Sequence, residues 1–87
     1  MTYEILLHPR AQRELDDLPR GMFPVLDRLI RALADNPRPQ GVKKLEGELH
    51  RIRSGPWRII YAIRDTERRV VILRVARRSE RTYKRLP

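Results

Sequence analysis

Arginine is the residue type in this sequence whose number and spacing could support binding and chemistry at phosphate groups. Five arginines in the C-terminal half are spaced so that a β-sheet could gather them on one face: Arg51, Arg53, Arg58, Arg74 and Arg78. A guanidinium group grips phosphate oxygens through paired hydrogen bonds and keeps its charge at physiological pH. Several together can hold a phosphate backbone and stabilise the charge that develops during phosphoryl transfer. These residues indicate a site for a polyanionic, phosphate-bearing partner.

A tyrosine follows the last of these arginines. The ring of Tyr83 could stack on a base, or its hydroxyl could donate a proton. It could equally anchor the end of the chain, which is the commoner role for such a residue taken alone.

The charge of the chain is unevenly distributed. The 87 residues include 20 Lys and Arg and 11 Asp and Glu, which gives a net charge of +9. Residues 1–48 hold eight basic and eight acidic side chains and are neutral. Residues 49–87 hold twelve basic and three acidic side chains, so 12 − 3 = +9 is the whole excess. Such an asymmetry predicts that a polyanion binds the C-terminal half.

Several classes of protein are disfavoured. The sequence contains no cysteine, which excludes disulfides and thiolate metal sites. His8 and His50 lie far apart without ligand spacing, so we expect no metal and no cofactor. No apolar run approaches the roughly 20 residues that span a bilayer, and the first residues do not resemble a signal peptide. We therefore expect a cytoplasmic protein with a single domain over residues 1–87.

The N-terminal half predicts one strand and two helices. Residues 3–7 are apolar and partly β-branched or aromatic, as in a strand. Pro9 suits the start of a helix, which should end at Pro19. Its apolar stripe consists of Ala11, Leu15 and Leu18. A second helix should start near Pro24 and stop at Asn36–Pro37. Its apolar face consists of Met22, Leu26, Leu29, Ile30 and Leu33.

The C-terminal half predicts an antiparallel meander. Residues 36–49 form a turn-rich connector, and strands are expected at 49–53, 57–64 and 70–77 with short turns between them. The tail could form one closing helical turn. The expected fold class is therefore α+β, in the order β-α-α-β-β-β, with the two helices covering one face of the sheet.

The turns predict which strand residues lie opposite one another. The expected pairs are Leu49 with Ala62, Arg51 with Ile60, Arg53 with Arg58, Arg58 with Arg74, and Ile60 with Ile72. Because side chains alternate along a strand, one face should collect the core residues Ile52, Trp57, Ile59, Tyr61, Ile63, Val71, Leu73 and Val75. The other face should carry the arginines among the apolar residues Leu49, Ile60, Ala62 and Ile72.

The segments LHRIRSGPWRIIYAI and VVILRVARRSERTY, with HPRAQRELDDLP and KKLEGEL before them, resemble the RelE/ParE superfamily of toxins from type II toxin–antitoxin systems. The resemblance covers nearly the whole chain and implies a small sheet with a helical hairpin on one face. It is nearest to RelE-type mRNA interferases, which are metal-independent, ribosome-dependent endoribonucleases that cut messenger RNA in the ribosomal A site. The 2′-hydroxyl attacks the adjacent phosphate there.

The resemblance implies roles for individual residues. The catalytic residues that it implies are Arg51, Arg53, Arg58, Arg78 and Tyr83. Further contacts to RNA and the ribosome are expected from Arg74, Arg77, Arg81, Lys84 and Arg85. Arginine stands at positions 51 and 53 where the best-known members have lysine, and arginine is a poor general base because its pKa exceeds about 12. The base is not assigned. His50 should lie on the hydrophobic face, and Glu48 and Glu80 are weaker candidates.

The expected partners are a RelB-like antitoxin with an acidic segment, messenger RNA and ribosomal RNA. Two other functions stay open. One is a ParE-like toxin that inhibits DNA gyrase, which would then be the partner. The other is a basic RNA- or DNA-binding domain without enzymatic activity.

Overall fold

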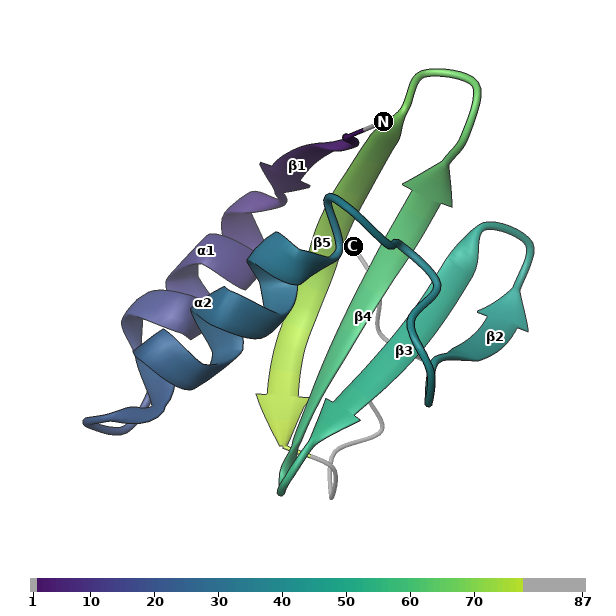
Figure 1. The fold of residues 1–87 in the computed structure, drawn as a ribbon. Coiled ribbons are helices and arrows are strands. Elements are labelled where there is room, and N and C mark those ends of the chain that lie inside the picture. The colour runs from purple at the N-terminus through teal and green to yellow at the C-terminus, as the bar shows by residue number, and fades with distance from the viewer. Residues whose placement is uncertain (1, 78–87) are drawn as a thin grey trace.

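The computed structural model describes residues 2–77, which fold into two helices and a five-stranded sheet. The elements are β1 (Glu4–Leu7), α1 (Pro9–Asp16), α2 (Met22–Ala32), β2 (Lys43–Glu46), β3 (Leu49–Ser54), β4 (Trp57–Arg64) and β5 (Arg69–Arg77). Figure 1 shows the helices side by side along one face of the sheet, which confirms the predicted α+β fold. Neither helix in this part of the chain is long and apolar enough to cross a membrane. The predicted residues Arg78, Arg81, Tyr83, Lys84 and Arg85, with Glu80 and the closing helical turn, lie outside the described residues.

Local signals set the helix boundaries. Pro9 occupies the first turn of α1, and the Nδ1 atom of His8 accepts a hydrogen bond from the Arg10 amide at 3.1 Å. This contact satisfies an amide that has no partner within the helix. Helix α2 begins at Met22, directly after Gly21, whose φ of 88° favours glycine. It therefore starts two residues before the predicted position at Pro24 and ends at Ala32.

The sheet has the strand order β1-β5-β4-β3-β2. The N-terminal strand β1 pairs in parallel with β5, and the other pairs are antiparallel. Strand β2 was not predicted, because its four residues were assigned to the connector. It pairs with β3 and forms the edge opposite β1. Three of its four side chains are charged, so it lacks the apolar alternation that identifies a strand in a sequence.

The predicted register is right between β3 and β4 and wrong between β4 and β5. Leu49 lies opposite Ala62, Arg51 opposite Ile60, and Arg53 opposite Arg58, as predicted. However, Arg58 lies opposite Ala76, and Ile60 lies opposite Arg74.

Two local features explain the altered register. The turn after β4 holds four residues, so Arg64 pairs with Arg69, and Arg68 adopts a φ of 53° within this turn. A bulge then leaves Leu73 between the pairs Ile60–Arg74 and Tyr61–Ile72. A bulge moves every later side chain of its strand by one position.

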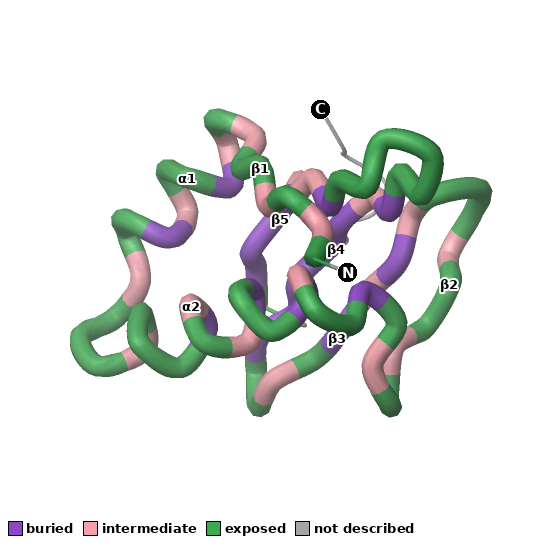
Figure 2. Tube along the Cα trace, turned by 45° about the horizontal axis from the view of Figure 1, so that its top comes forward, coloured by how far each residue is buried: buried purple, intermediate pink, exposed green. Residues whose placement is uncertain are grey.

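The core lies between the helices and one face of the sheet. Of the predicted core residues, the buried ones are Ile52, Trp57, Ile59, Tyr61, Ile63 and Val75. Val71 and Leu73 were assigned to the core wrongly, because the four-residue turn brings Val70 and Ile72 there instead. For the same reason, Ile72 is not on the arginine face. Figure 2 shows the buried residues concentrated in the central strands.

Candidate nucleic-acid interface

Three of the predicted site residues lie together on adjacent strands. Arg51 and Arg53 flank Ile52 in β3, and Ile52 packs into the core against the helices. Because side chains alternate, both arginines lie on the face that points away from the helices. Arg58 of β4 lies directly opposite Arg53, so it shares this face. We call Arg51, Arg53 and Arg58 the arginine face.

The three arginines differ in exposure. Arg53 is exposed and Arg51 is half-buried, whereas Arg58 is only 7% exposed. Ile60, the next residue of β4 on the same face, is fully buried. Charges attract a phosphate more strongly where water is largely displaced than at an open surface. Arg58 therefore occupies the least hydrated position of the arginine face.

Arg74 is bound by an acidic side chain from helix α1. Its Nε atom donates to both carboxylate oxygens of Glu14, at 3.1 and 2.9 Å, and its Nη2 atom lies 2.7 Å from Oε2. The same carboxylate accepts the Val75 amide at 2.8 Å, just beyond the bulge. Glu14 thus fixes the bulged strand to the helix. Sequence reasoning missed this contact, because Glu14 and Arg74 are 60 residues apart in the chain.

Arg77 lies on the other side of the sheet. It pairs with Trp57, and its guanidinium carbon lies 4.8 Å from the centroid of the Trp57 ring. This is a cation–π contact. Since Trp57 belongs to the core cluster, Arg77 does not join the arginine face. Its predicted contact with RNA stays a prediction.

Strand β2 extends the basic surface beyond the predicted residues. Lys43 lies opposite Arg51, so its side chain falls on the face of the arginines. A pocket opens here across β2 and β3. Its lining residues are Lys43, Lys44, Leu45, Glu46, Leu49 and Arg51. The sequence signal for this extension was the pair Lys43–Lys44, which was counted in the neutral half of the chain.

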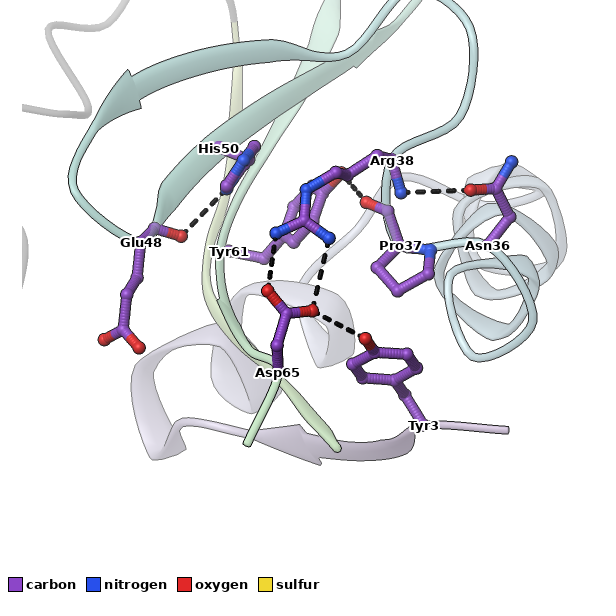
Figure 3. Close-up of polar contacts among 8 residues, drawn as sticks. All are labelled: Tyr3, Asn36, Pro37, Arg38, Glu48, His50, Tyr61 and Asp65. Atoms are coloured by element: carbon purple, nitrogen blue, oxygen red, sulfur yellow. Dashed lines mark hydrogen bonds and ion pairs between the residues drawn. The ribbon is translucent and has the colours of Figure 1, made fainter. Parts of the chain in front are cut away.

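A second polar cluster lies at one end of the sheet and has a structural role (Figure 3). Arg38 donates to both carboxylate oxygens of Asp65, at 3.2 and 2.8 Å, and the Tyr3 hydroxyl donates to Oδ1 at 2.6 Å. The bonds from Arg38 and then from Tyr3 lower the pKa of Asp65 to about 2. Hydrogen bonding to Asp65 also raises the pKa of Tyr3. These contacts join the N-terminus, the connector and the β4–β5 turn.

His50 belongs to the same end of the sheet. It is buried and stacks on Tyr61 with ring centroids 5.9 Å apart, while its Nδ1 atom lies 2.8 Å from the Glu48 carbonyl oxygen. The Tyr61 hydroxyl donates to the Pro37 carbonyl at 2.7 Å, and burial raises its pKa to about 12. His50 therefore lies on the hydrophobic face, as predicted, and the sheet separates it from the arginines.

The sequence of this chain matches a known protein family over most of its length. Residues 5–82 match the family described as the ParE toxin of the type II toxin–antitoxin system, parDE. The chain belongs to this family. The match covers all the helices and strands described above except Glu4, the first residue of β1, and it includes the arginine face.

Individual relatives carry RelE names. Toxin RelE of Mycobacterium tuberculosis is 36% identical over 81 residues, covering 88% of this chain and 82% of the relative. A RelE1 protein of Methanocaldococcus jannaschii is 33% identical over 89 residues, covering 97% and 98%. The crystal structure of the archaeal RelE–RelB complex from Pyrococcus horikoshii contains a similar chain, with a TM-score of 0.82 and 29% identity over 92% of this chain and 99% of that one. The chain is thus a RelE-like toxin of a toxin–antitoxin system.

Proposed function

We propose that this toxin is a ribosome-dependent endoribonuclease that cuts messenger RNA in the ribosomal A site and so inhibits translation. The observation that carries the proposal is the register of β3 and β4, which gathers Arg51, Arg53 and Arg58 on one face. Three cations at such spacing suit the successive phosphates of a nucleic-acid strand. The RelE names of the relatives support the same activity.

The proposed reaction is a transfer within the RNA. The 2′-oxygen forms a bond to the adjacent phosphorus while the bond from that phosphorus to the next nucleotide's 5′-oxygen breaks. The 2′-proton leaves to a base, and the 5′-oxygen gains a proton to become a hydroxyl. Negative charge grows on the non-bridging oxygens, where guanidinium groups stabilise it best. In the proposal Arg58 contacts these oxygens, and Arg51 and Arg53 hold flanking phosphates.

We also propose that an antitoxin with an acidic segment covers the arginine face. Arginines lie there among the half-buried apolar side chains Leu49 and Ala62, and a partner with both characters would match that surface. The Pyrococcus horikoshii protein, which has a similar fold, is in complex with RelB. An antitoxin complex in which only the helices are covered, with the arginine face open, would contradict this proposal.

A translation reaction tests the activity. The purified chain is added to ribosomes that translate a defined message, and primer extension maps the cuts. Breaks in phase with codons, absent from the same message without ribosomes, are expected. An intact message together with inhibited DNA supercoiling by gyrase would instead assign the ParE-like function, which the name of the matched family favours. RNA binding with neither effect would indicate a non-enzymatic binding domain.

A further inference from the structure

The pocket across β2 and β3 has a volume of about 380 Å³, within the range of small-molecule sites. Its lining is ordered along the strands. Lys43 lies opposite Arg51 at one end, and Glu46 lies opposite Leu49 at the other. A bulge between these two pairs adds Leu45 to the lining. Cations therefore mark one end of the pocket, whereas leucines and a carboxylate mark the other.

This order of side chains matches the chemistry of one nucleotide. The cationic end suits a phosphate, and two leucines offer an apolar surface to the face of a base. A carboxylate accepts hydrogen bonds and donates none, so it favours a base edge that carries an amino group. Cytosine presents such an amino group where uracil presents an oxygen.

The pocket is continuous with the arginine face. Arg51 belongs to both, and Arg53 follows two residues along the same strand, which is a spacing of about 7 Å. One strand of RNA can therefore contact the pocket and Arg58 together.

We propose that this pocket binds a nucleotide next to the cleaved phosphate, with its phosphate on Lys43 and Arg51 and the amino group of its base on Glu46. The inference rests on the proposed function, because it places the same RNA substrate. It adds that Glu46 makes the toxin prefer a base with an amino group over uracil at this position. An acidic protein segment fits the pocket less well, because Glu46 would repel it.

Equilibrium binding tests the pocket without any cleavage. Fluorescence anisotropy of labelled single-stranded RNA hexamers compares oligocytidine with oligouridine on the full chain at low salt. We expect oligocytidine to bind roughly tenfold more tightly. Glu46→Gln should remove most of this preference, because an amide can also donate to the uracil oxygen. Glu67→Gln, at an exposed side chain of the β4–β5 turn outside the pocket lining, is the matched control and should keep the preference.

A second variant tests the cationic end. Lys43→Ala should weaken the binding of both hexamers several-fold and by the same factor, because a contact to a phosphate does not distinguish one base from another. Equal affinity for the two hexamers on the unaltered protein would overturn the proposal, and so would a preference that survives Glu46→Gln. Loss of binding to an antitoxin peptide in Lys43→Ala, with RNA binding unchanged, would assign the pocket to the antitoxin and overturn it as well.

These readouts separate the two proposals. If the chain cleaves message on ribosomes but binds both hexamers equally, the proposed endoribonuclease function stands and the proposed nucleotide pocket is refuted. If the chain prefers oligocytidine through Glu46 but never cleaves message, the proposed nucleotide pocket stands and the proposed endoribonuclease function is refuted.

Discussion

Arg53 of β3 and Arg58 of β4 lie directly opposite one another in the antiparallel ladder, on the face away from the helices. Two like charges in this position destabilise a sheet unless something else requires them. In the proposed function, the phosphates of the RNA would offset this repulsion. Arg58 is nearly buried beside the exposed Arg53, so it is the first residue to test by mutation.

Replacing Arg58 with alanine should abolish most cleavage. Loss of one positioned donor to a developing oxyanion typically costs about 100–1000-fold in rate. Single-turnover cleavage on programmed ribosomes measures the loss, and circular dichroism checks that the variant is folded. Arg28→Ala, at an exposed position of α2, is the matched control and should cleave like the unaltered protein. Near-normal cleavage by Arg58→Ala would contradict the proposed mechanism.

Removing Glu14 should destabilise the fold through the bulged strand. Glu14→Ala takes the carboxylate from the buried Arg74 guanidinium and leaves the Val75 amide without its acceptor. Breaking a buried ion pair in this way costs about 3–5 kcal/mol. Urea unfolding measures the change, and Asp17→Ala, at an exposed residue just after α1, should change stability little. Equal midpoints for the two variants would show that the contact contributes nothing.

Stability should fall in acid through Asp65. Its folded pKa of about 2 lies below the unfolded value of about 3.9, so the folded state favours the ionised carboxylate. The stabilisation is therefore complete above about pH 5, declines below the unfolded pKa and is lost as the pH falls through the folded pKa. Urea unfolding between pH 2 and pH 6 should show a smaller acid-dependent loss in Asp65→Asn than in the unaltered protein. Asp35→Asn, an exposed carboxylate after α2, should leave the profile unchanged.

Binding to ribosomes should depend steeply on salt, because the arginines replace counterions on RNA. Arg68→Ala removes a charge in the β4–β5 turn, away from the arginine face. It should weaken binding slightly and leave the rate of cleavage at saturating protein unchanged. Titrations at several salt concentrations separate the two effects. If Arg68→Ala stopped cleavage at saturation, the site would have to include the turn.

The sequence predicted the fold wherever apolar alternation was strong. The pattern around Ile52, Ile59 and Tyr61 allowed one register for β3 and β4, because a slip by one residue would have buried the arginines. Strand β2 escaped prediction, because its charged residues follow no such pattern. The register of β5 was wrong, because a turn length and a bulge are decided by local backbone geometry that alternation does not reveal.

The site was predictable in part. Arg51, Arg53 and Arg58 were placed together correctly, since two strands and one short turn determine their positions. The contact of Glu14 with Arg74 and the pocket beside Lys43 depend on segments that only the folded chain brings together. Sequence spacing carries no signal for such contacts.

The bulge at Leu73 sets the phase of the last strand. If β5 paired with β4 without this bulge, Leu73 would lie opposite Ile60, and every later side chain of β5 would change to the other face of the sheet. Val75 would then turn toward the arginines, and Arg74 would turn into the core. The bulge therefore lets Ile72 and Val75, three residues apart, face the same core, so the backbone geometry at Leu73 is under as strict a constraint as the arginines.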